Sequence, residues 1–288
     1  MRGIHTFIAA AALLGVFGCE SEELDYVGGG DKSDGLIPTR QVWPHGDVYL
    51  IVEASEEQEA VVTELHAAAA DLELNTGVRV HFIDEPSEAV DGYYVVFNAL
   101  SGDGTGGVAP VGTRIGGEAH SRARSVRHEL GHIIGLAHTQ NRVDRDESIT
   151  IHTQYIREGF EKQFDPLGYL RLVGPYDTNS IMHYTSSAFS TATCAVISIG
   201  SSDPEECIID GANYIVSAPE AYSDWNYSVI AASYCEPRFC GEFCAEAQRC
   251  ETQEVQSHID RLTEWELSSE GLAHAGRWPQ HLPYVPSN

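Results

Sequence analysis

A run of histidine, glutamate and glycine in the middle of the chain constrains its fold more than any other feature. His128 and His132 stand four residues apart, and Glu129 follows the first of them. Residues four apart share one face of an α-helix, so the two histidines can direct their imidazoles at one ion. Gly135 can adopt a positive φ and end the helix, and the resulting turn would bring His138 to the same point.

Three imidazole ligands leave a position open for water, which is typical of a catalytic zinc site. Bound zinc lowers the pKa of its water from about 15.7 to ~7 and polarises a carbonyl. Glu129 would act as the general base that takes the proton and passes it to the leaving amine. A bare His-Glu-x-x-His arises often by chance, but Gly135 and His138 stand at the offsets of the longer metzincin signature. We therefore expect one catalytic Zn2+ bound by His128, His132 and His138.

The same signature includes a downstream turn that contains a methionine. Residues 180–184 read Ser-Ile-Met-His-Tyr, and Met182 is one of only two methionines in the chain. Met182 would form an apolar floor beneath the ligands, a role that also agrees with ordinary core packing. His183 is expected to be structural, because three imidazoles already suffice.

Together these motifs resemble the astacins, a family of zinc peptidases within the metzincins. The family's Arg-x-Asp-Arg-Asp segment stands here at residues 142–146, and its Ser-x-Met-His-Tyr turn at residues 180–184. The resemblance covers roughly residues 38–235. It implies an α+β, two-lobed catalytic domain, with a twisted mixed sheet and helices above it, and a loop-rich lower lobe that carries the Met-turn. Substrate would lie extended between the lobes, against a sheet edge at Gly116–Ala119.

The resemblance also assigns Tyr184 a catalytic role, as the phenol that hydrogen-bonds the oxyanion near zinc. The alternative is a buried tyrosine with a satisfied hydroxyl. Residues 142–146 would form a structural charge network. The family usually has Glu directly after the third histidine, where it receives the buried N-terminus of the processed enzyme, but Thr139 stands here.

The N-terminus indicates export. Residues 1–18 predict a signal peptide, since an apolar run follows Arg2 and is too short to span a bilayer. The residues before Cys19 resemble a bacterial lipobox, so Cys19 is expected to carry a lipid; ordinary cleavage nearby, with Cys19 left free, is the alternative. Residues 19–37 are acidic and glycine-rich and would form a linker.

The charge balance limits the partners. The chain has 43 acidic and 17 basic residues, for a formal net charge of −26. Such a surface repels nucleic-acid phosphates and anionic lipid. We expect no nucleic-acid partner, membrane contact only through a lipid on Cys19, and a monomer that acts on protein or peptide substrates. It would be secreted or held in the bacterial cell envelope.

Six further cysteines predict disulfides, because an even set in an exported chain is typical of them. They are Cys194, Cys207, Cys235, Cys240, Cys244 and Cys250. A zinc site at Cys240 and Cys244 is the less favoured alternative. Residues 38–235 would form the catalytic domain, and residues 236–288 a small cysteine-containing extension packed on it.

Hydrophobic periodicity predicts the remaining elements. Strands are expected at 47–52, 78–82 and 93–97, a glycine-rich loop at 101–107, and helices at 55–74, 125–136, 153–164 and around 255–265. Ser55 and Gln58 fit a capping box at the start of the first helix. Strands that alternate with a helix suggest an α/β-type N-terminal half.

These observations predict a secreted zinc endopeptidase that hydrolyses internal peptide bonds with zinc-activated water and Glu129 as the base. Two alternatives stay open. One is a catalytically silent binding protein that keeps the same fold, and the other is a zinc amidase that acts on a cell-wall peptide.

Overall fold

A computed structural model describes most of the chain between residues 42 and 277. The described ranges are 42–102, 106–112, 115–168, 171–191, 194–200, 213–215, 217 and 219–277. The expected signal peptide, Cys19 and the linker at 19–37 lie outside them. Among the described helices, none has the length and hydropathy needed to cross a membrane.

A five-stranded mixed sheet forms the centre of the first lobe, which we call the sheet lobe (described residues within 42–137). Its strands are β1 (Asp47–Glu53), β2 (Arg79–Phe82), β3 (Tyr94–Ala99), β4 (Gly107–Val108) and β5 (Ile115–Ser121). The order is β2-β1-β3-β5-β4, with β4 antiparallel to β5 and the other pairs parallel. The outermost strand on that side is β4, which pairs only with His120 and Ser121 of β5 among the described residues. The sheet edge expected at Gly116–Ala119 therefore stays a prediction.

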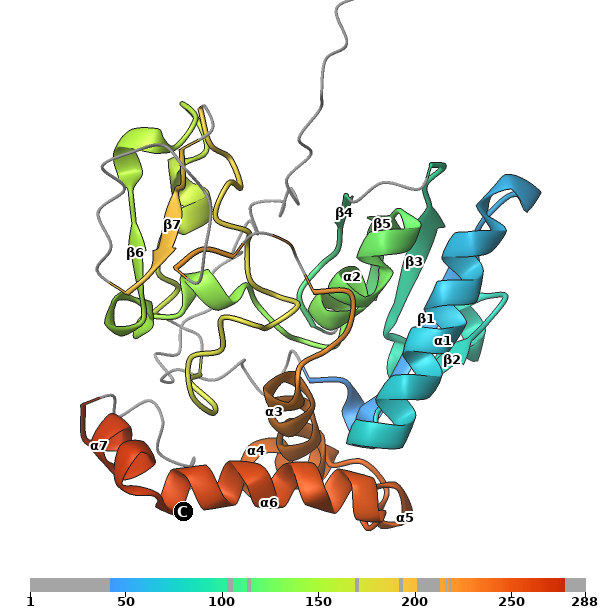
Figure 1. The fold of residues 1–288 in the computed structure, drawn as a ribbon. Coiled ribbons are helices and arrows are strands. Elements are labelled where there is room, and N and C mark those ends of the chain that lie inside the picture. Colours follow the sequence, from blue (N-terminus) through green and yellow to red (C-terminus); the bar gives the residue numbers. More distant parts are fainter. Residues whose placement is uncertain are drawn as a thin grey trace, which may run out of the picture.

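Two helices, α1 (Glu59–Thr76) and α2 (Val126–Ile133), cover one face of this sheet (Figure 1). The capping box of Ser55 and Gln58 forms as expected in the 3-10 turn before α1. Gly77 ends α1 in the left-handed region, with φ 73°. Apolar side chains of α1, α2 and the sheet form one core, so α2 lies on a rigid support.

The second lobe, which we call the loop lobe (described residues within 138–223), has little regular structure. Its two strands, β6 (Ile149–Ile151) and β7 (Ile197–Ile199), pair antiparallel over a small core of their own. The helix expected at 153–164 is wrong, because only the 3-10 turns Thr153–Tyr155 and Glu161–Phe164 form there. Gly159, with φ 88°, interrupts the segment. The expected α+β architecture with two lobes is confirmed.

Five helices follow the loop lobe. They are α3 (Asp224–Cys235), α4 (Pro237–Cys240), α5 (Ala247–Cys250), α6 (Gln253–Leu267) and α7 (Ser269–Arg277). The helix expected around 255–265 is confirmed as α6, which lies across α3 (Figure 1) and buries Val255, Ile259 and Leu262.

Short 3-10 turns connect many of these elements. Besides the two named above, they are Pro44–Gly46, Glu56–Gln58, Pro86–Glu88, Val90–Gly92, Ala123–Ser125, Thr139–Asn141, Arg145–Glu147 and Gly241–Phe243.

Disulfides cross-link this helical region, as expected. Cys235 is bonded to Cys250, and Cys240 to Cys244. Cys194 in the loop lobe is also disulfide-bonded. The bond between Cys240 and Cys244 excludes the alternative zinc site at these two residues.

Candidate metal centre

The end of α2 is shaped by a glycine. Gly135 has φ 107°, its N–H donates to the carbonyl of His132, and the N–H of Leu136 donates to the carbonyl of Gly131. These two bonds form the Schellman motif, which satisfies the last helical carbonyls and reverses the chain. The reversal returns His138 toward α2, as the glycine in the sequence predicted.

The structure brings the three predicted ligands together. The Nε2 atom of His138 lies 3.2 Å from the Nε2 atoms of both His128 and His132. Three nitrogens of a tetrahedral zinc ion, each about 2.05 Å from the metal, would lie about 3.3 Å apart. The separation observed is therefore the one that zinc requires, and the donor set of three imidazoles suits this metal.

Two of the imidazoles are oriented by backbone carbonyls. The Nδ1 atom of His128 lies 2.8 Å from the carbonyl oxygen of Ile181, and that of His132 lies 2.8 Å from the carbonyl oxygen of Leu136. Each ring thus donates its Nδ1–H to a carbonyl, which leaves the Nε2 lone pair available for a metal ion.

Burial keeps these rings neutral, which is the form that binds metal. Desolvation, together with the neighbouring His128, lowers the pKa of His132 to about 3. Burial likewise lowers the pKa values of His128 and His138. The cluster is therefore ready to bind a cation at neutral pH without first losing protons.

Glu129 is fully buried beside the cluster, against the edge strand β4. A Cβ atom on Gly107 would lie 2.7 Å from Oε1 of Glu129 and 2.6 Å from the carbonyl oxygen of His120. Only glycine fits there, so the carboxylate and β4 are in direct contact. Sequence reasoning placed Gly107 in a glycine-rich loop and missed this role, although the glycines themselves were the available signal.

The Met-turn packs beneath α2. Met182 is buried, and a Cβ atom on Gly131 would lie 2.6 Å from its sulfur. The carbonyl of Met182 accepts from the N–H of Thr139, directly after the third ligand. His183 instead contacts the hydroxyl of Tyr176 at 2.7 Å, in agreement with the structural role expected.

Tyr184 lies next to the third ligand. Its ring centroid is 4.4 Å from that of His138, and its hydroxyl donates to Oε1 of Gln163 at 3.2 Å. The hydroxyl is therefore held near the cluster by a side chain of the loop lobe. Sequence reasoning did not identify Gln163, because no local pattern connects it to residue 184.

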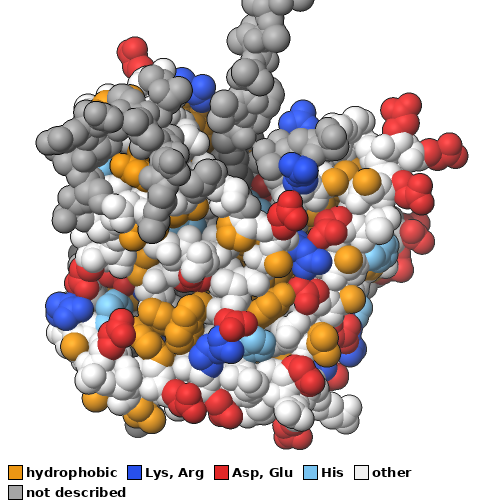
Figure 2. Space-filling view, viewed as in Figure 1, with side chains coloured by type: hydrophobic (Ala, Val, Ile, Leu, Met, Phe, Trp, Pro, Cys, Tyr) orange, Lys and Arg blue, Asp and Glu red, His pale blue; other side chains and the backbone are white. Residues whose placement is uncertain are grey.

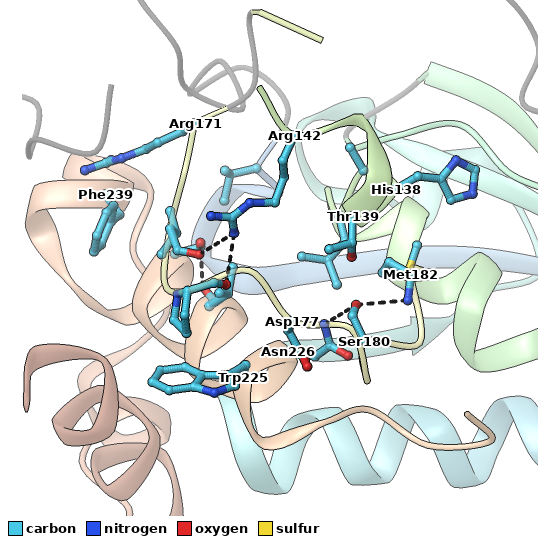
Figure 3. Close-up of a pocket in the computed structure, with 17 residues that line it drawn as sticks. His138, Thr139, Arg142, Arg171, Asp177, Ser180, Met182, Trp225, Asn226 and Phe239 are labelled. Carbon is cyan, nitrogen blue, oxygen red and sulfur yellow. Dashed lines mark hydrogen bonds between the residues drawn. The ribbon is translucent and has the colours of Figure 1, made fainter. Parts of the chain in front are cut away.

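A cavity of about 100 Å³ lies on the other side of His138, between the loop lobe and α3 (Figure 3). Thr139 lines it, at the position where the family usually has a glutamate. Arg142 crosses it and donates to the carbonyls of residues 173–175, at 3.3, 3.0 and 3.2 Å. The loop after the third ligand is therefore tied to the segment before the Met-turn.

Comparisons with known proteins agree with this geometry. A sequence model of the family Astacin (peptidase family M12A) matches residues 36–209. Astacin-like metalloprotease toxin 1 of Loxosceles intermedia is 31% identical over 159 residues, which are 54% of this chain and 58% of the toxin. Toxin 5 of Loxosceles gaucho is 31% identical over 160 residues, 54% of this chain and 84% of the toxin.

A solved structure has the same fold. It is that of high choriolytic enzyme 1, a hatching enzyme zinc-protease from the medaka Oryzias latipes, with a TM-score of 0.51 and 22% identity. The match covers 67% of this chain and 94% of the other.

Proposed function

Because the chain belongs to the astacin family of metallopeptidases, we propose that it is a zinc-dependent endopeptidase that cleaves internal bonds of protein or peptide substrates. The observation that carries the proposal is the convergence of three imidazoles, with Nε2 of His138 3.2 Å from Nε2 of both His128 and His132, next to the buried carboxylate of Glu129. Neither a structural zinc site nor a core of packed histidines needs such a carboxylate.

His128, His132 and His138 would hold the zinc. When bound, it supplies a Lewis acid for the scissile carbonyl and makes water acidic enough to attack near neutral pH. Glu129 takes a proton from the attacking water and later gives it to the leaving amine. Its contact with β4 limits movement of the carboxylate on that side, because the backbone at Gly107 lies directly against it.

Tyr184 would stabilise the negative charge that develops on the scissile carbonyl oxygen. A phenolic hydroxyl is a strong donor to such an oxyanion. In this structure the hydroxyl is bonded to Gln163, and the ring rests on His138. During catalysis, the hydroxyl of Tyr184 would leave Gln163 and donate its hydrogen bond to the oxyanion.

The substrate would bind as an additional strand. Among the described residues, β4 pairs only with β5, so its outer side offers backbone groups to an extended peptide. That peptide would pass close to Glu129, which contacts the same strand at Gly107. A peptide bound along β4 would continue on both sides of Glu129, so cleavage would fall within the chain rather than at its end.

The disulfides indicate an oxidising compartment outside the cytoplasm. We propose that residues 1–18 direct export, that Cys19 carries a lipid in a bacterial envelope, and that residues 38–235 are the catalytic domain. Acidic side chains are spread over the face shown in Figure 2, in keeping with the net charge of −26. Such a surface favours basic or neutral protein substrates over anionic polymers.

Casein digestion by the zinc-loaded protein tests the function, with Glu129→Gln as the matched variant. The variant keeps the shape of the side chain and removes the base, so we expect it to retain zinc and to lose activity by about 10²–10⁴-fold. Equal activity in both proteins would contradict the proposal. Zinc binding without cleavage of any protein, but with cleavage of cell-wall peptides, would favour the amidase instead.

A further inference from the structure

The third ligand, His138, is held differently from the other two. No hydrogen bond joins its Nδ1 atom to another described residue, whereas His128 and His132 each bond a carbonyl. Its position therefore depends on the loop that follows it, residues 139–147. Whatever holds this loop also sets the geometry of the ligand.

The centre of that loop is a buried carboxylate. Asp144 is 3% exposed and accepts from Nε and Nη2 of Arg142 at 2.9 and 2.7 Å. It also accepts from Nε2 of His274 at 2.7 Å. Burial alone would raise the pKa of Asp144, but the bonds from Arg142 and His274 hold it below its usual value.

His274 reaches the loop from α7, 130 residues further along the chain. Its ring is also buried, at 7% exposure, and lies 5.6 Å from the ring of Trp265 on α6. One turn further, Arg277 donates to both carboxylate oxygens of Glu147 at 3.1 and 2.9 Å. Two side chains on one face of α7 thus contact the same loop.

We propose that α7 is a clamp on the metal centre, in which His274 is a positioning residue that holds His138 in place through Asp144. Both clamp residues lie beyond residue 209, where the match to the family ends. The C-terminal helices would thus serve the metal centre through the loop that follows His138. The inference rests on the proposed zinc peptidase function.

The rate of zinc release from the loaded full-length protein tests the clamp, measured with an excess of a chromogenic chelator. His274→Phe keeps a ring of similar size but cannot donate to Asp144, so we expect release to become about tenfold faster. Hydrogen exchange of residues 139–147 should rise in the same variant. His274→Gln restores a donor and should recover most of the wild-type rate.

His258→Phe is the matched control. His258 is equally buried, at 8%, and lies in the same helical region, but its ring packs 5.2 Å from Tyr227, and no hydrogen bond joins it to the described residues 139–147. We expect zinc release from this variant to stay within twofold of wild type. Equal release and equal exchange in His274→Phe and His258→Phe would overturn the clamp.

A second variant covers the case in which His274→Phe fails to fold. Arg277 is largely exposed, so Arg277→Ala should leave the fold intact and speed zinc release by a smaller factor, about twofold. If wild-type protein binds zinc but cleaves no protein, the proposed function falls while the clamp stands. If substitutions in α7 do not change the rate of zinc release while the protein digests casein, the clamp is contradicted and the proposed function is not.

Discussion

In the sheet lobe, the two proposed zinc ligands His128 and His132 lie one turn apart on α2, a helix that packs on the sheet and on α1. In the loop lobe, the proposed third ligand His138 lies on an irregular segment, directly before the short 3-10 turn Thr139–Asn141. The first arrangement needs only helical periodicity and a packed core. The second depends on the buried carboxylate of Asp144, which is bonded to the nearby Arg142 and to the distant His274. Substitutions in the two lobes should therefore fail in different ways.

The largest effect is expected in the loop lobe. Asp144→Asn leaves Arg142 and His274 facing a neutral amide inside the protein, and a broken buried ion pair costs about 3 kcal/mol of unfolding free energy. Urea denaturation of the zinc-loaded protein would measure the loss. Asp146→Asn is the control, since Asp146 is 75% exposed in its contact with Arg145, and it should change stability by less than about 0.5 kcal/mol.

The sheet lobe should instead lose catalysis. Gly107→Ala places a Cβ atom 2.7 Å from Oε1 of Glu129, so the carboxylate must move and kcat should fall about 100-fold with zinc retained. Steady-state kinetics would measure the fall in kcat, and metal analysis would show whether zinc is retained or lost. Gly168→Ala adds a Cβ atom with nothing within 4 Å and should leave kcat unchanged; a matching loss there would remove the steric explanation.

The burial of His183 in the Met-turn predicts how the stability of the protein depends on pH. Burial lowers the pKa of His183 to about 4 from 6.5, so the unfolded chain binds the extra proton between these values and stability falls as pH falls. Metal-free wild type should lose about 2 kcal/mol more than His183→Gln between pH 7 and pH 5, because one pKa unit corresponds to about 1.4 kcal/mol. Parallel curves from urea titrations of the two proteins would contradict the assignment.

The smallest effect should appear where the lobes meet. Gly131→Ala pushes against the sulfur of Met182, a flexible side chain that can shift, so we expect a loss of about 1 kcal/mol. Combining it with Met182→Ala, which opens space, should recover part of the loss caused by Gly131→Ala. Strict additivity in this double-mutant cycle would mean that the two residues do not interact.

Much of the sheet lobe could be predicted from the sequence. The spacing of His128 and His132, the position of Gly135 and the periodicity of α1 are local features, and local features determine helices and their ends. The helix expected at 153–164 was wrong because its apolar spacing, a local feature, does not show what those residues pack against. Its apolar residues pack in the small core of the loop lobe, and the positive φ of Gly159 interrupts the segment.

By itself, the sequence determined the metal-binding helix, the turn toward the third ligand and the kind of ion that three imidazoles select. Only the tertiary structure decided that β4 is the outermost strand, that Gly107 meets Glu129, and that His274 bonds Asp144. The physical reason is distance along the chain. Contacts between residues tens or hundreds of positions apart leave no periodic trace, because they arise only when the elements have packed.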